Sequence, residues 1–118
     1  MVDVLTKIGA KVYRTDEFPP PRDRAFRNAW GVDETSRVIV VDMLRARDVW
    51  REKIRQARKE QFAQLDADFI RALEEGKDTK TISARKKELR DAPQDARIET
   101  ATSPEELKQV QPAGLQVD

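Results

Sequence analysis

The stretch that decides the fold is DMLRARDVWREKIRQARKEQFAQLDADFIRALEE, residues 42–75. Its apolar positions recur at steps of three and four, which keeps them on one face of a helix with 3.6 residues per turn. The row consists of Ala46, Trp50, Ile54, Ala57, Gln61, Leu65, Phe69 and Leu73. Asp42 is the expected N-cap, and Gly76 stands where a left-handed residue ends a helix. The pattern predicts one uninterrupted helix of about 34 residues, ~50 Å long.

This helix is longer than a small core can cover along one side. Lys53 and Asp68 lie at the margin of the apolar row and Gln61 lies within it, so a regular coiled coil is not expected. Bases are in excess from Asp42 to Glu60, and acids are in excess from there to Glu75. Such asymmetry is compatible with a solvated helix, or with an antiparallel or partner-docked arrangement that brings the basic half against an acidic surface. We expect a helix packed partly on its own chain and partly on another protein.

The segments before the helix predict an extended arm and a hairpin. Residues 1–22 contain short β-like runs followed by Pro19, Pro20 and Pro21, which favour an extended conformation; a spacer is the simpler interpretation and a proline-rich recognition motif the alternative. Residues 23–41 predict a β-hairpin, with one strand over 24–30, a turn over 31–36 and a second strand over 38–41. This hairpin would lead directly into the helix and would need a partner surface.

The segments after the helix complete a helical hairpin over residues 42–92. A second helix is expected from Lys80 to about Asp91, capped by Asp78 or Thr79, packed antiparallel on the first and ended by Pro93. Leu73, Phe69, Ile82 and Leu89 would form the elbow between the two helices.

Residues 93–118 predict a polar connection anchored by Ile98, a short helix to about Val110, and a tail over 113–118. That short helix begins at Ser103-Pro104-Glu105-Glu106, the pattern of a capping box. The fold class is therefore mainly α with a small N-terminal β-hairpin, a long central helix, an antiparallel second helix and a short C-terminal helix.

The composition argues against catalysis and against binding of a metal or cofactor. The chain has no His and no Cys, so the commonest general base and the usual metal ligands are missing, and its four Gly form no phosphate-binding loop. Asp66 and Asp68 are two residues apart on a helix and point in different directions. We therefore expect no enzymatic activity, no catalytic residue, no cofactor and no metal.

Charge and hydropathy limit the partners. The 23 bases and 22 acids leave a net charge of +1, so nucleic-acid binding is not expected, although the basic half of the long helix leaves DNA contact open. No apolar run has the length of a membrane span, and no secretion signal precedes the first strand. The expected place of synthesis is the cytoplasm.

The aromatic and large apolar residues are the candidates for a protein interface. Trp30 and Trp50 have the most surface to bury, and each belongs either to the core or to an interface. The candidate interface residues are Phe26, Trp30, Trp50, Ile54, Phe62, Leu65 and Phe69.

An ordered set of segments carries a family resemblance. The set comprises DRAFRNAW at residues 23–30, Val41-Asp42-Met43 with Ala46 and Trp50-Arg51, LRDAP at residues 89–93, and residues 102–110 with Pro112. Over residues 22–112 the chain resembles small proteins of tailed bacteriophages that are encoded among tail genes, and its second half is similar to tail and tail-fibre assembly chaperones.

The resemblance implies a non-enzymatic role in the phage tail, with other tail proteins as partners and a homo-oligomer within the assembly. The protein would be either a structural adaptor of the virion tail, at the tail tip or a fibre attachment, or a chaperone that is absent from the mature particle. A marginal hairpin, a proline-rich strap and an overlong helix favour the structural component, because such segments gain order by lying on neighbouring subunits.

Overall fold

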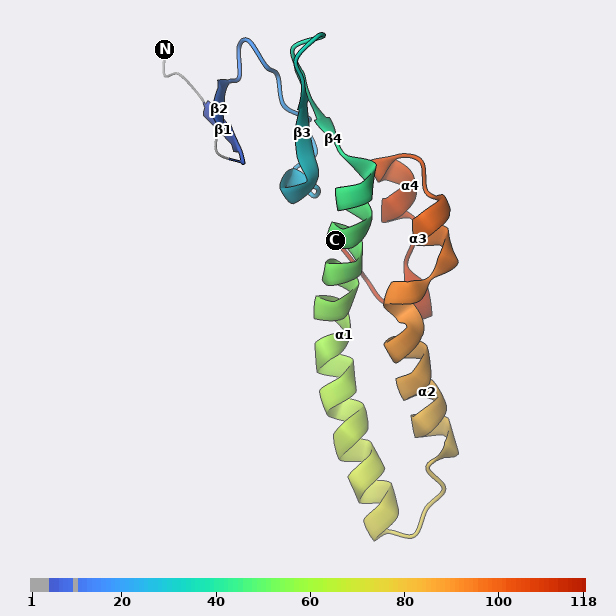
Figure 1. The fold of residues 1–118 in the computed structure, drawn as a ribbon. Coiled ribbons are helices and arrows are strands. Elements are labelled where there is room, and N and C mark those ends of the chain that lie inside the picture. Colours follow the sequence, from blue (N-terminus) through green and yellow to red (C-terminus); the bar gives the residue numbers. More distant parts are fainter. Residues whose placement is uncertain (1–4, 10) are drawn as a thin grey trace. The chain divides into compact units, whose positions relative to one another are not determined.

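A computed structural model describes residues 5–9 and 11–118 (Figure 1). The chain divides into two compact units, residues 1–49 and residues 50–118, and the boundary falls inside the long helix α1. None of the boundaries expected from the sequence falls there. The expected fold class is confirmed, since helices dominate and the strands precede them.

The first unit contains two separate two-stranded antiparallel sheets. In one, β1 (Leu5–Ile8) pairs with β2 (Lys11–Arg14); in the other, β3 (Trp30–Asp33) pairs with β4 (Val38–Val41). The second sheet is the expected hairpin, whereas the first replaces the expected extended arm. Part of the β-like run expected near the N-terminus, residues 2–4, lies outside the described residues. Gly9 has a φ of 61°, which lets the chain reverse between β1 and β2.

The first strand of the expected hairpin was placed wrongly. Residues 24–29 do not form a strand: a 3₁₀ turn, η1 (Arg27–Ala29), occupies the segment, and β3 begins only at Trp30. Phe26 and Ala29 are both buried, and their spacing of three suits a helical turn rather than the alternation of a strand. The expected turn over residues 31–36 is also displaced, because Asp33 ends β3 and its carboxylate accepts the backbone N–H groups of Thr35 and Ser36.

Helix α1 (Met43–Glu74) confirms the central prediction. Asp42 Oδ1 accepts the backbone N–H of Leu44 at 3.0 Å, so Asp42 caps the first turn as expected. At the other end Gly76 has a φ of 66°, and the N–H of Lys77 donates to the carbonyl of Ala72 at 2.8 Å. This closing bond is the one expected at a glycine-terminated helix.

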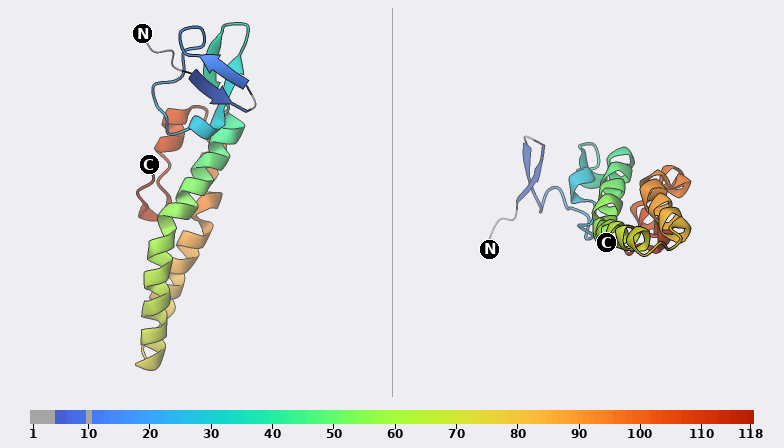
Figure 2. Two further views of the ribbon diagram at one scale, coloured as in Figure 1. Left: turned by 90° about the vertical axis from the view of Figure 1, so that its left-hand side faces the viewer. Right: turned by 90° about the horizontal axis from the view of Figure 1, so that it is seen from below.

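Helix α2 (Lys80–Asp91) runs back along α1, and the views in Figures 1 and 2 agree on this. Its first turn is capped by Asp78, whose Oδ1 accepts the N–H of Lys80 at 2.8 Å, and not by the side chain of Thr79. Arg58 of α1 donates to the carbonyl of Leu89 at 3.0 Å. Farther along the pair Arg85 donates to Gln61 Oε1 at 2.8 Å. The antiparallel packing of the two helices is therefore confirmed.

The C-terminal region is more helical and better buried than expected. It comprises η2 (Ala92–Gln94), α3 (Ala96–Thr100), α4 (Pro104–Lys108) and η3 (Pro112–Gly114). Helix α3 was not expected; Asp95 caps it by accepting the N–H of Arg97 at 2.9 Å. Hydrogen bonds from the Arg97 side chain are the main reason that the pKa of Asp95 lies below its usual value.

Helix α4 begins as expected, with one change in its cap. Ser103 Oγ accepts the N–H of Glu106 at 3.2 Å. The carboxylate of Glu106 accepts the backbone N–H of Thr102 at 2.9 Å, one residue earlier than a capping box predicts. Hydrogen bonds from the backbone and hydroxyl of Thr102 lower the pKa of Glu106.

The expected tail over residues 113–118 is also a wrong prediction. Leu115 and Val117 are buried, and the Gln111 side chain bonds both backbone groups of Val117. Together with the rest of this region they build the core of the second unit around the first half of its α1 segment. That core consists of Trp50, Ile54, Leu89, Ala92, Ile98, Ala101, Leu107, Val110, Leu115 and Val117. Ile98 thus takes the anchoring role that the sequence predicted.

Candidate functional site

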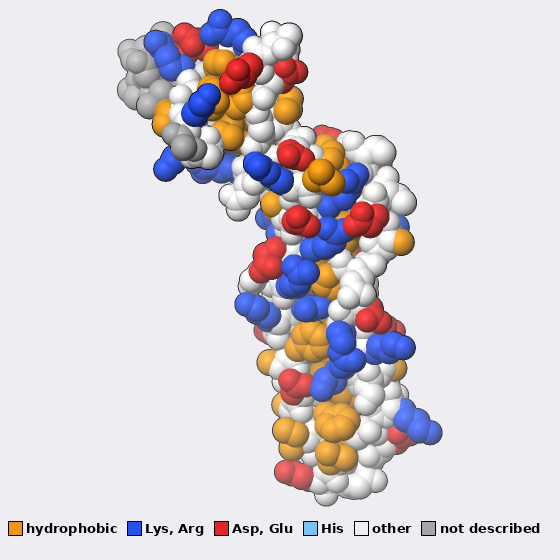
Figure 3. Space-filling model, viewed as in Figure 1, with side chains coloured by type: hydrophobic (Ala, Val, Ile, Leu, Met, Phe, Trp, Pro, Cys, Tyr) orange, Lys and Arg blue, Asp and Glu red, His pale blue; other side chains and the backbone are white. Residues whose placement is uncertain are grey.

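The second half of α1 carries a row of apolar side chains that the chain does not fully cover. We name it the distal stripe, and it consists of Phe62, Leu65, Phe69, Ile70 and Leu73. Ile70 is 57% exposed and Leu73 is 59% exposed, while the other members are half-buried. Figure 3 shows hydrophobic side chains gathered over this end of the α1–α2 pair, with charged side chains around them.

The composition of α2 explains why the stripe stays open. Beside the first half of the unit's α1 segment lie α2, α3 and the C-terminal segment, but only α2 runs beside the distal half (Figures 1 and 2). Ile82 is the large apolar residue that α2 offers near its start, and it is only half-buried. Ala72 is the buried α1 residue at this end, and its small side chain fills little space.

Cations take the place of apolar partners over the aromatic rings. The guanidinium of Arg58 lies 5.3 Å from the ring centroid of Phe62, and the ammonium of Lys86 lies 5.3 Å from that of Phe69. Lys86 also pairs with Asp66 at 2.7 Å. These contacts shield one side of each ring with the end of a long basic side chain.

The interface candidates predicted from the sequence separate into two sets. Phe26, Trp30, Trp50 and Ile54 are buried within the chain, so they are core residues and cannot act as exposed anchors. Phe62, Leu65 and Phe69 are the candidates that the structure brings together, since they share the distal stripe. Trp50 has a structural reason for its burial: its indole N–H donates to the carbonyl of Val110 at 2.9 Å.

The two most exposed members of the stripe were missed as interface residues. Leu73 was expected to be covered in the elbow between the helices, but α2 leaves it in solvent. Ile70 stands beside the apolar row and was given no role. The available signal was the adjacent pair Phe69-Ile70, because two large apolar residues in succession widen a helix face beyond what one neighbouring helix covers.

The charge asymmetry of α1 is partly matched inside the chain. In the basic half Arg51 pairs with Glu99 of α3, and in the acidic half Asp66 pairs with Lys86 of α2. The antiparallel interpretation of the charge pattern thus accounts for these pairs. In each pair the carboxylate is exposed and the basic side chain is largely covered, so these contacts help to orient the helices.

Candidate metal-ligand clusters and membrane-spanning helices are both missing from the described part of the chain. Among its residues, no group of three or more His, Cys, Asp or Glu side chains is placed to hold a metal ion. No helix there combines the length and the hydropathy that a bilayer crossing requires.

Comparison with protein families, with curated proteins and with solved structures finds no match to this chain.

Proposed function

We propose that this protein is a non-enzymatic component of a bacteriophage tail that docks on neighbouring tail subunits through the distal stripe. The single observation that supports a docking role most strongly is the exposure of Ile70 and Leu73 beside three half-buried apolar residues on one helix end. The phage context is supported by the ordered resemblance over residues 22–112.

Docking would remove the apolar surface of the distal stripe from water. Each Å² of apolar surface removed from water contributes about 25 cal/mol, and large side chains that are more than half exposed leave much of that gain unused. An aromatic and aliphatic cluster with a charged rim has the composition of the central part of a protein interface. The partner surface should be apolar at its centre and should carry acceptors for Arg58 and Lys86 at its edge.

The alternative within the same context is an assembly chaperone that leaves before the particle is complete. Purified mature particles analysed by quantitative mass spectrometry distinguish the two roles. The structural role predicts the chain in the particles at a constant ratio to the tail proteins. Its presence in infected cells together with its absence from particles would reject that role in favour of the chaperone.

Crosslinking tests the docking surface directly. A photoreactive amino acid at Leu73 should crosslink to another tail protein in assembling particles. The same group at Leu44 is the matched control, because Leu44 is also a leucine of α1 and is 73% exposed. Equal crosslinking from both positions would show that exposure alone, and not the distal stripe, determines contact.

A further inference from the structure

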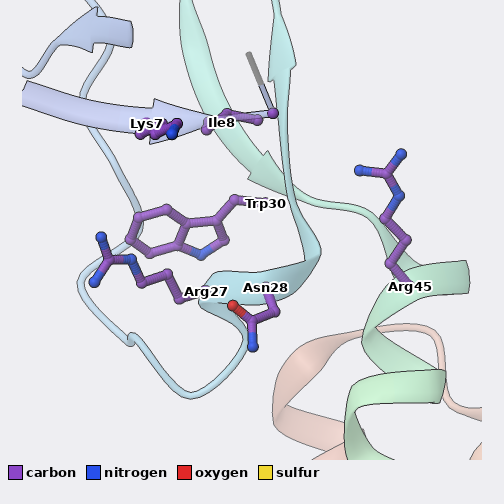
Figure 4. A pocket seen from close by; sticks show the side chains of 7 residues that line it. Lys7, Ile8, Arg27, Asn28, Trp30 and Arg45 are labelled. Carbon is purple, nitrogen blue, oxygen red and sulfur yellow. The ribbon is translucent and has the colours of Figure 1, made fainter. Parts of the chain in front are cut away.

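The first unit contains a small cavity whose chemistry is unrelated to the distal stripe. Its volume is about 190 Å³, and its walls come from four elements of the unit (Figure 4). Lys7 and Ile8 belong to β1, Arg27 and Asn28 to η1, Trp30 to the start of β3, and Arg45 to the first turn of α1. The remaining lining residue is Gly9.

The polar groups around this cavity are nearly all hydrogen-bond donors. Lys7, Arg27 and Arg45 supply three positive charges, and the amide of Asn28 supplies one donor group and one acceptor oxygen. Among the described residues that line the cavity there is no carboxylate. Arg45 also pairs with an acid outside the lining, Asp42, whose Oδ2 lies 3.8 Å from its Nε.

The indole of Trp30 gives the second, independent sign of a ligand. Trp30 is 3% exposed, and its Nε1 is a buried donor without a hydrogen-bond partner in the structure. Figure 4 shows the nitrogen on the edge of the ring that is turned toward Arg27 and Asn28. Arg24 lies over the same ring, 5.7 Å from its centroid, and adds positive charge nearby. A buried N–H that lacks an acceptor is unfavourable, so an acceptor supplied by a ligand is favoured here.

The size and charge of the cavity select the class of ligand. Sites for whole small molecules measure about 300–1,000 Å³, so this cavity is suited to a single anionic group. A carboxylate brings one charge and two oxygens, whereas a phosphate monoester brings about 1.5–2 negative charges and three acceptor oxygens at pH 7. Arginine guanidinium groups match phosphate oxygens in pairs. Three cations and two neutral donors therefore fit a phosphate better than a carboxylate.

We propose that the cavity formed by Lys7, Arg27, Asn28, Trp30 and Arg45 binds a phosphate monoester group, with the Trp30 indole N–H donating to one of its oxygens. The group is the terminal phosphate of a small molecule or of a phosphorylated residue, or free inorganic phosphate. The cations hold its charge, and the buried indole supplies the donor that distinguishes a seated phosphate from loosely attracted counterions.

The two tryptophans allow phosphate binding in this cavity to be tested in one type of spectrum. The chain has two Trp, so ¹H–¹⁵N spectra contain two indole signals. The Trp50 signal is an internal reference, because its N–H already donates to Val110. Titration of the full chain with inorganic phosphate at constant ionic strength should move the Trp30 signal saturably and leave the Trp50 signal in place.

Variants identify the cations that hold the ligand. Arg27→Gln and Arg45→Gln should each weaken phosphate binding about ten- to a hundredfold, the effect of losing one charged hydrogen bond. Arg55→Gln is the matched control, because Arg55 also lies exposed on α1 and pairs with an acid three residues earlier, as Arg45 does. The dispersed Trp30 signal itself reports that the first unit of each variant is folded.

Titrations with other ligands distinguish phosphate from the other possible anions. Phosphoserine should bind as inorganic phosphate does, and acetate and chloride should not. A Trp30 signal that stays in place, that moves together with Trp50, or that moves equally with chloride would overturn the proposal. Equal or tighter binding of acetate would assign the cavity to a carboxylate instead. Binding of an oligonucleotide without a terminal phosphate, but not of phosphate itself, would assign it to a nucleic-acid backbone and likewise overturn the proposal.

Discussion

The indole Nε1 of Trp50 donates to the backbone carbonyl of Val110 at 2.9 Å, across 60 positions of the chain. Both groups are buried, and the bond joins α1 to the segment that follows α4. The polar N–H of this large buried side chain thus meets a carbonyl that lies beyond the end of α4. This pair is therefore where the long helix and the C-terminal region are held in register.

Replacement of Trp50 by Phe should show the value of this bond. The substitution removes the donor, leaves the buried carbonyl of Val110 without its partner and opens a small cavity, so unfolding should become easier by about 2–4 kcal/mol. Urea denaturation followed by circular dichroism measures the change. A loss below about 0.5 kcal/mol would mean that water replaces the indole at no cost.

The caps of α4 and α2 provide a matched pair of variants. Ser103→Ala removes the oxygen that accepts the N–H of Glu106, and it should cost about 1 kcal/mol of stability. Thr79→Ala changes the N-cap of α2, whose side chain accepts no capping bond, and it should stay within about 0.5 kcal/mol of the parent. Equal losses in the two variants would show that cap hydrogen bonds do not determine the difference.

Acid should weaken the C-terminal region. The pKa of Glu106 is lowered from 4.5 by Thr102, and that of Asp95 is lowered from 3.8 chiefly by the side chain of Arg97. As the pH falls, the unfolded chain takes up these protons first, so the stabilisation is complete above the unfolded pKa values and is lost as the pH drops through the folded ones.

The urea midpoint measured from about pH 7 to about pH 3 should decline at the acid end, and the decline should be shallower in Glu106→Gln and Asp95→Asn. Because the chain has no His, no side chain with an unperturbed pKa titrates between about pH 5.5 and 8, and the midpoint should be nearly constant there. A midpoint that changes steeply around neutrality would contradict this assignment.

Substitutions in the distal stripe should separate docking from folding. Ile70→Ser together with Leu73→Ser should abolish incorporation into particles while changing the stability of the isolated chain by no more than about 1 kcal/mol, because both side chains are mostly in water. Incorporation is measured by mass spectrometry of purified particles and stability by urea denaturation. Leu44→Ser, the control on the same helix, should leave both unchanged. Normal incorporation of the double variant would reject the stripe as the docking surface.

The parts of the fold that were predictable from the sequence are those set by neighbours in the chain. The period of α1, the cap at Asp42 and the glycine at position 76 are local signals, and the structure contains all of them. Helix α2 follows in the same way from its short connection. The capped start of α4 was also visible, although Glu106 bonds Thr102 rather than Ser103.

The wrong predictions concern features that depend on distant contacts. Leu115 and Val117 lie in the segment that was expected to be a tail, and they are buried because they pack on the core while the Gln111 side chain bonds the backbone of Val117. The alternation of Phe26, Asn28 and Trp30 suggested a strand, yet Ala29 is buried together with Phe26 and Trp30, which a strand would not allow. Leu73 is exposed because α2 presents little apolar surface to it. The residue pattern of α1 alone does not show this.

The turn between α1 and α2 has a practical consequence. Residues 73–78 are exposed, and Gly76 has its left-handed φ there, while the side chains that join the two helices lie farther back, at Arg58, Gln61 and Asp66. Exposed tips of this kind accept nicks and insertions. The chain could therefore be divided after Lys77 into two fragments that reassemble when mixed. Reassembly would show that α1 and α2 associate without a covalent link, and the two fragments could then serve as a split reporter.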